Sequence, residues 1–371
     1  MASLLSSSYK SSQDHPSQEH SNFASHPLLP QKPLLIAYCS LKDLALINPD
    51  DLQAIDVINL AFAHVKEASL HFDPPADLIK ELARLRRQKE DLRIVLSVGG
   101  WSSGGFSEMA SSEKKRACFC QSSLDTLQRY ELDGLDIDWE YPGFRVAGIG
   151  ASPEDHIFFT ALLQDLRHTL GDQRILSIAA GGDRYFVKNT DVADYVPFLD
   201  YIQLMTYDLR GGFSIVTGHH SNLYAPKGDL SDASCDTAVK AFLAASCPSE
   251  KLVLGAAYYA REWKLSSVSS PEESYGVMCA STGGYGPSLD ELLELEQSAA
   301  YVKCHDGCAS ASWLYGEGRF ISYDDRESLK AKCSYVKNQK LRGLMFWEYG
   351  LGAKCHMTRQ LGEWLSENFS I

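Results

Sequence analysis

The chain has 371 residues, of which 44% are hydrophobic, 22% charged and 11% aromatic, and its formal net charge is -13. This composition is typical of a globular protein, and the acidic excess argues against nucleic acid or an anionic membrane surface as the main partner. For so acidic a chain, a neutral ligand is the better expectation. No stretch of the sequence is apolar for long enough to span a bilayer.

The first thirty residues are polar and lack the apolar segment of a secretory signal. We therefore expect residues 1–32 to form a disordered polar tail and residues 33–371 to form the folded domain. The expected location is cytoplasmic, or secreted if a leader is missing or export is non-classical. In the cytosol the ten cysteines would remain reduced.

Eight short apolar or β-branched runs recur along the chain, separated by longer amphipathic stretches such as Asp77–Lys89 and Pro153–Thr169. Near-continuous apolar runs that alternate with helical patterns are typical of parallel strands covered by helices. The sequence therefore predicts an α/β fold, a (β/α)8 TIM barrel, with its active site at the C-terminal ends of the strands. The eight runs are Leu34–Ser40, Val57–Ala63, Arg93–Val98, Gly134–Glu140, Arg174–Ala180, Tyr201–Tyr207, Leu252–Tyr258 and Gly343–Glu348.

The gap between the seventh and eighth runs is much longer than the others. It contains Gly283-Gly284, several tyrosines and an amphipathic piece, Leu289–Val302. We interpret residues 264–321 as a small α+β insertion between strands 7 and 8, and Asp324–Lys337 as the last barrel helix before the eighth strand.

The fourth run continues into a row of acids, Asp-Gly-Leu-Asp-Ile-Asp-Trp-Glu-Tyr-Pro over residues 133–142. Side chains alternate along a strand, so Asp136, Asp138 and Glu140 should share one face. Three buried carboxylates at this spacing cannot all ionise cheaply, and their pKa values should be pushed apart, as is typical of catalytic sites. Asp133 is out of phase and is interpreted as a structural hydrogen-bonding group.

These motifs together resemble those of glycoside hydrolase family 18, the chitinase-like enzymes, over about residues 34–365. Residues 133–142 resemble the family's DGxDxDWEYP signature at every specified position. Ser97–Trp101 resembles its SxGGW motif, and Met205–Asp208 resembles the motif of strand 6. Weaker matches are Ala37-Tyr38 at strand 1, Tyr258–Arg261 at strand 7 and Phe346–Glu348 at strand 8.

Glu140 is the best-placed proton donor, since it lies nearest the mouth of the barrel, and we expect neighbouring Asp138 to raise its pKa. No second carboxylate is placed as a nucleophile. The resemblance implies instead that the 2-acetamido group of the substrate attacks, giving an oxazolinium ion and net retention. It implies that Asp138 orients this group and turns between Asp136 and Glu140, and that the Tyr207 hydroxyl contacts the acetamido oxygen. We expect Asp136 and Asp138 to share a proton.

The remaining site residues are expected to contact the sugar or support the acids. Tyr38 and Ser97 should hydrogen-bond Asp136, and Trp347 should stack under the sugar ring. The resemblance implies sugar contacts for Asp208, Met205, Trp101, Tyr259 and Arg261. No cofactor or metal is expected: Cys304-His305-x-x-Cys308 resembles part of a zinc site, but no second pair of ligands stands out.

The predicted reaction is therefore hydrolysis of β-1,4 linkages between N-acetylglucosamine units in chitin or its oligomers. The expected partner is such an oligo- or polysaccharide, bound by a monomer. Two alternatives remain open: an endo-β-N-acetylglucosaminidase that cuts N-glycan cores, and a non-catalytic chitin-binding lectin. The complete set of acids disfavours the lectin, and the long insertion favours the chitinase branch.

Overall fold

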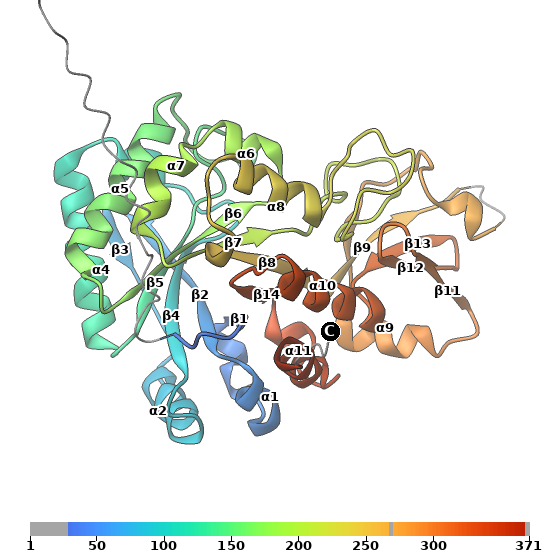
Figure 1. Ribbon diagram of the computed structural model, residues 1–371, viewed down its shortest axis with the longest axis horizontal. Coiled ribbons are helices and arrows are strands. Elements are labelled where there is room, and N and C mark those ends of the chain that lie inside the picture. The colour runs from blue at the N-terminus through green and yellow to red at the C-terminus, as the bar shows by residue number, and fades with distance from the viewer. Residues whose placement is uncertain (1–28, 267–269, 368–371) are drawn as a thin grey trace, which may run out of the picture.

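The computed structural model describes residues 29–266 and 270–367, and all eight predicted strands are present in it. They form a closed barrel in which neighbouring strands run parallel, with β1 paired to both β2 and β14 (Figure 1). The predicted tail lies almost entirely outside the described residues. The barrel strands are β1 (Leu34–Ser40), β2 (Val57–Lys66), β4 (Arg93–Gly99), β5 (Gly134–Asp138), β6 (Ile175–Gly181), β7 (Tyr201–Met205), β8 (Leu252–Ala257) and β14 (Gly343–Trp347).

Each strand run divides its side chains between two cores. One set fills the barrel interior, where residues such as Ile36, Val95, Val253 and Met345 pack together. The other set packs outward against the helices in a much larger core. Burial on both faces explains why the strands read as near-continuous apolar runs, and it makes any polar residue that points inward conspicuous.

Helices cover the outside of the barrel, and the amphipathic stretches Asp77–Lys89, Pro153–Thr169 and Asp324–Lys337 are confirmed as α2, α5 and α10. Within the described residues, no helix has both the length and the apolar character needed to cross a bilayer. The helices are α1 (Pro49–Ala54), α2 (Leu78–Gln88), α3 (Phe106–Ala110), α4 (Glu113–Arg129), α5 (Asp155–Leu170), α6 (Arg184–Lys188), α7 (Val192–Tyr195), α8 (Cys235–Ala244), α9 (Leu289–Glu296), α10 (Arg326–Asn338) and α11 (Met357–Ser366).

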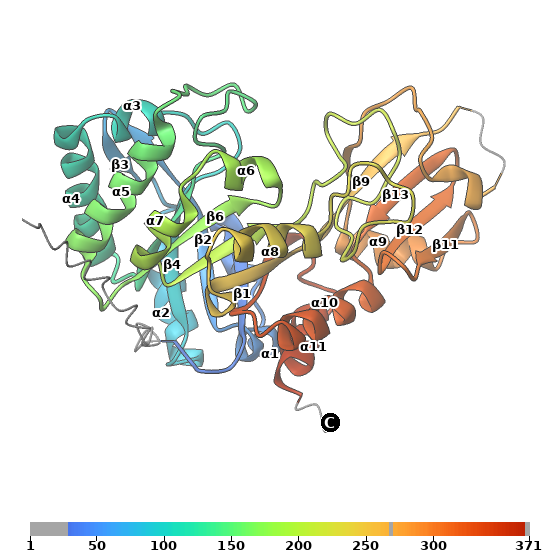
Figure 2. The same ribbon diagram turned by 45° about the horizontal axis from the view of Figure 1, so that its top comes forward.

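A second sheet forms between β8 and β14, in the region where the sequence predicts the insertion over residues 264–321. Its strands are antiparallel in the order β10-β9-β13-β12-β11, and it stands beside the barrel with α9 (Figures 1 and 2). The sheet begins earlier than the predicted insertion, because the chain enters β9 almost directly from β8. The strands are β9 (Tyr259–Lys264), β10 (Gly284–Ser288), β11 (Tyr301–Asp306), β12 (Ala311–Gly316) and β13 (Arg319–Tyr323).

Several predicted strand ends differ from the observed ones by one to three residues. Four runs were extended to Glu140, Tyr207, Tyr258 and Glu348, but the strands stop one or two residues sooner. Past each end the chain leaves the barrel and turns over its mouth, so apolar and aromatic residues continue without strand pairing. The short strand β3 (Ser69–His71), which pairs with β2 outside the ring, is absent from the sequence prediction.

The close approach of β5 and β6 requires a residue without a side chain at position 134. A Cβ on Gly134 would lie 2.3 Å from the carbonyl oxygen of Ile175, whereas Gly212 has nothing within 4 Å of such an atom. We expect Gly134→Ala to lower the free energy of unfolding by about 2–3 kcal/mol, and Gly212→Ala to change it by less than about 0.5 kcal/mol. Urea unfolding measures both, and equal midpoints would contradict the packing described.

Candidate active site

The acidic row lies at the C-terminal end of β5, in the middle of the barrel mouth. Asp136 and Asp138 belong to the strand, while Glu140 follows it, and all three side chains are buried. The register places Ser97 of β4 and Ser177 of β6 level with Asp136, so both neighbouring strands present a hydroxyl to it.

Asp136 accepts four hydrogen bonds. The hydroxyls of Tyr38 and Ser97 donate to Oδ2 at 2.9 and 2.7 Å, as the sequence predicts. The Ser177 hydroxyl and the Gln203 side-chain amide donate to Oδ1 at 2.7 and 2.9 Å. Burial is the larger effect and leaves the pKa of Asp136 above its usual value, while the four donors oppose this rise by stabilising the carboxylate. Asp136 is therefore the acid best able to carry a negative charge inside the barrel.

Gln203 and Ser177 were missed in the sequence prediction. Gln203 lies within the apolar run of β7, donates to Tyr38 as well as Asp136, and accepts a hydrogen bond from Asn59 of β2 at 2.8 Å. A signal was present: a polar residue embedded in a run that is otherwise buried and apolar requires a polar partner. Asp133 has the structural role predicted for it, because it accepts a hydrogen bond from the backbone of Ile94.

Asp138 has a different environment from Asp136. Its side chain is buried, and its Oδ1 has no hydrogen-bond partner among the described residues. Burial, then Glu140 and Asp136, raise the pKa of Asp138 well above its usual range. The expected sharing of a proton between the two aspartates stays a prediction: the pKa of both is raised, and the four donors make Asp136 the better placed of the two for a negative charge.

Glu140 is a buried carboxylic acid with its pKa raised to about 7. Burial is the largest cause, hydrogen bonding from Tyr141 acts in the opposite direction, and the charge of Asp208 raises the pKa again. The sequence prediction named Asp138 as the source of the shift, whereas burial is the largest cause. Repulsion between Glu140 and Asp138 raises the pKa of Asp138, and the ionised Asp208 adds to the shift of Glu140.

Asp208 follows β7 and is held by Arg261 of β9. The guanidinium donates to both carboxylate oxygens at 2.6 Å. Burial raises the pKa of Asp208, but Arg261 and His220 lower it by more than burial raises it. The carboxylate is therefore ionised. Arg261 in turn stacks on Tyr285, with 3.9 Å between the guanidinium carbon and the ring centroid. The sequence prediction did not include Tyr285.

Tyr207 and the neighbouring strand ends complete the ring around the acids. Tyr207 packs edge-on against Tyr259, and its hydroxyl lies 4.0 Å from the sulfur of Met345. Met205 and Tyr259 are buried at the ends of β7 and β9. The Tyr207 hydroxyl has therefore no oxygen or nitrogen partner among the described residues, as a donor awaiting a ligand would require.

Aromatic rings form the floor and rim of the mouth. Trp347 stacks on Phe62 at 5.4 Å and leans on Tyr38 at 5.6 Å. At the rim, Trp101 is 49% exposed and faces Phe213, which is 76% exposed, at 6.2 Å. The two rim rings come from the loops after β4 and β7. Phe213 was missed because no pattern marks a single aromatic residue in a long loop.

The Cys304–Cys308 segment does not gather its cysteines around His305. Instead His305, Asp325 and Glu327 bring one ligand atom each to within 4.8 Å of one another. The ammonium of Lys303 lies 2.9 Å from Asp325 and already neutralises the buried member of this group. All ten cysteines lie within the described residues and have free thiols.

This arrangement can protonate a leaving group and stabilise a positive charge close to it. Glu140 supplies the proton, Asp138 a carboxyl group, Tyr207 a hydroxyl donor, and Trp347 an apolar surface. A neutral ligand with both apolar faces and polar substituents, such as a sugar ring, fits these groups.

Comparison with known proteins was consistent across sequence and structure. The family model described as glycosyl hydrolases family 18 matches residues 34–352. The chain is 32% identical over 298 residues to chitinase A1 of Niallia circulans, covering 74% of this chain and 43% of that protein. It is 33% identical over 287 residues to chitotriosidase-1 of Mus musculus, covering 73% and 61%. The chain thus spans about half the length of these relatives.

A solved structure matches over nearly its whole length. It is a glycoside hydrolase family 18 N-acetylglucosaminidase from Paenibacillus barengoltzii, with a TM-score of 0.85 and 42% identity. The match covers 90% of this chain and 99% of the other.

The environment of Glu140 predicts how it titrates. We expect its carboxyl group to lose its proton near pH 7, so that it is an acid below that pH and a carboxylate above it. Asp208→Asn removes the nearby negative charge and should lower the pKa of Glu140. Infrared difference spectra measure the titration, and the Glu140→Gln variant identifies its signal. A wild-type pKa near 4.3, the value of a free glutamate, would contradict the described burial.

Proposed function

The chain belongs to glycosyl hydrolases family 18, and on this premise we propose that it hydrolyses β-1,4 linkages between N-acetylglucosamine units. The observation that carries the proposal is the pairing of Glu140, an acid whose pKa is raised to about 7, with the buried Asp138 beside it, whose pKa is also raised. The named activities of the relatives, chitinase, chitotriosidase and N-acetylglucosaminidase, support the same substrate class.

The site supports substrate-assisted cleavage with retention of configuration. Retaining glycosidases of the two-carboxylate kind need a free carboxylate nucleophile, and family 18 is an exception to that scheme. Asp208 is ionised but both of its oxygens are bound to Arg261, and Asp136 is surrounded by four donors. The acetamido group of the substrate therefore acts as the nucleophile, and it forms an oxazolinium ion as Glu140 protonates the leaving oxygen.

Asp138 and Tyr207 hold the acetamido group during this step. Asp138 accepts its N–H, which becomes more acidic as the ring closes, and the Tyr207 hydroxyl donates to its oxygen. When Asp138 turns toward the substrate, Asp136 remains behind as a carboxylate that Tyr38, Ser97, Ser177 and Gln203 already stabilise. Trp347 supports the sugar face from below.

Short, soluble oligosaccharides are the proposed substrates. The solved structure named as an N-acetylglucosaminidase aligns along 99% of its length, and the facing rings of Trp101 and Phe213 lie 6.2 Å apart at the rim. Comparable rates on crystalline chitin and on soluble oligomers would contradict this preference.

Glu140→Gln should abolish turnover while it leaves sugar binding intact. The amide has nearly the same shape but cannot donate a proton, so we expect the turnover of a fluorogenic N,N′-diacetylchitobioside to fall by at least about 10²-fold. Calorimetric binding of a chitooligosaccharide is the control for folding. Full activity of the variant would overturn the assignment. Binding without wild-type turnover would identify a lectin, and neither binding nor turnover would favour an N-glycan substrate.

Asp138→Asn tests the assisted mechanism separately from the acid. Asparagine keeps an acceptor oxygen for the acetamido N–H, but it cannot ionise or exchange a proton with the neighbouring acids, so kcat should fall by about 10²-fold or more. Asp133→Asn is the matched control, because Asp133 belongs to the same segment but bonds the backbone of Ile94. Near-normal turnover in Asp138→Asn would exclude substrate assistance.

A further inference from the structure

Two adjacent histidines in the segment between β7 and α8 have no part in the mechanism proposed above. His219 and His220 are both buried, and neither ring has a hydrogen-bond partner among the described residues. Buried polar atoms are almost always partnered, so these rings require an explanation. They face different acids: His219 lies 3.7 Å from Asp306 of β11, and His220 Nδ1 lies 3.7 Å from Oδ1 of Asp208.

The backbone fixes the position of the His220 ring. The backbone N–H of His220 donates to the Ser322 hydroxyl of β13 at 3.0 Å. The backbone carbonyl of His220 accepts from the N–H of Leu209, the residue after Asp208, at 3.0 Å. The ring also packs on Tyr259 at 5.3 Å. His220 is thus tied to both the second sheet and the chain that carries Asp208, and its ring has little freedom to move away.

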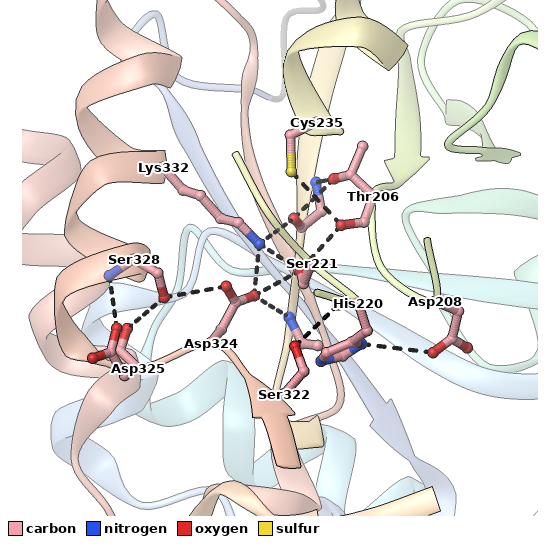
Figure 3. Close-up of polar contacts among 12 residues, drawn as sticks. Thr206, Asp208, His220, Ser221, Cys235, Ser322, Asp324, Asp325, Ser328 and Lys332 are labelled. Carbon is pink, nitrogen blue, oxygen red and sulfur yellow. Dashed lines mark hydrogen bonds and ion pairs between the residues drawn. The ribbon is translucent and has the colours of Figure 1, made fainter. Parts of the chain in front are cut away.

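The next residue is anchored even more firmly (Figure 3). Lys332 of α10 and Asp324 form a fully buried ion pair of 2.6 Å, and the Lys332 ammonium donates to Ser221 Oγ at 2.6 Å. The Ser221 hydroxyl donates to Asp324 at 2.9 Å and lies 3.1 Å from the carbonyl oxygen of Thr206. Figure 3 shows His220 between this cluster and Asp208.

The charged and titratable groups around His220 are therefore few. Asp208 faces it after β7, Arg261 and Tyr259 face it from β9, and His219 precedes it in the same segment. The Asp324–Lys332 pair lies beyond Ser221 and neutralises itself. Arg261 donates to both oxygens of the Asp208 carboxylate, and His220 lies 3.7 Å from one of them, Oδ1.

We propose that His220 is a positioning residue for the hydrolysis: its Nδ1–H donates to Asp208 and holds that carboxylate in place for the sugar and for Glu140. The inference rests on the proposed function. Its physical basis is that Arg261 alone can pivot with the carboxylate, whereas a second donor from a rigidly anchored segment fixes the orientation. In this proposal, the 3.7 Å between His220 Nδ1 and Asp208 Oδ1 shortens to a hydrogen bond when the substrate binds, as catalytic hydrogen bonds often do.

A double-mutant cycle tests whether His220 acts through Asp208. We expect His220→Phe, which keeps the ring packing but loses the donor, to lower kcat/KM on the chitobioside by about tenfold or more. In an Asp208→Asn background the same change should have almost no further effect. His220→Asn keeps an N–H donor and should restore most of the activity. His219→Phe is the matched control, equally buried, and its effect should be small and the same in both backgrounds.

The outcomes separate this inference from the proposed function. An inactive wild type would overturn both. An active wild type in which His220→Phe and Asp208→Asn multiply their losses would overturn the role of His220 alone, as would a His220→Asn variant no better than His220→Phe. If His220→Phe gives no folded protein, His220→Leu replaces it in the same cycle, with thermal unfolding of each variant as the measure of folding.

Discussion

The structure depends on the stabilisation of one acidic group, Asp136, buried inside the barrel. Asp136 lies where apolar side chains would ordinarily fill the interior, and an unpaired carboxylate there would cost several kcal/mol. Four donors from β1, β4, β6 and β7 offset that cost, so half of the barrel strands contribute to a single carboxylate. The same donors favour a negative charge on Asp136 over one on Asp138, whose pKa is raised well above its usual range, and the pKa of Glu140 is raised by burial and by Asp208. The acid chemistry follows from this ordering.

The second sheet contributes to the same site from outside the barrel. Arg261 reaches Asp208 from β9, Ser322 of β13 bonds the backbone of His220, and the buried pair of Asp324 and Lys332 joins the end of that sheet to α10. Removing one partner of such a pair is costly because the other charge is left unpaired. The module is therefore connected to the strand end at Thr206 by charge and hydrogen bonds as well as by packing.

The sequence predicted the strands, the acid row and the donors that belong to motifs, because periodic burial and local acid spacing are visible along the chain. It predicted Tyr38 and Ser97 as partners of Asp136, but not Ser177 or Gln203, since these come from strands whose register with β5 is known only after the barrel closes. It assigned the shifted pKa of Glu140 to the nearest acid in sequence, but it did not foresee burial as the largest cause or the charge of Asp208, from the end of β7. His220 and Tyr285 were missed for the same reason: their importance arises from contacts between distant segments.

Closure of the ring also constrains how the chain is made. The first strand pairs with the last, Leu34 beside Gly343, and β14 inserts between β1 and β8. Until the final strand leaves the ribosome, β1 and β8 present unpaired edges, and such edges are the surfaces through which incomplete sheets associate. Contacts this distant in sequence also slow folding. A chain of this design is therefore most vulnerable to aggregation late in synthesis, and chaperone protection of those two edges would matter more than protection of any other part of the nascent protein.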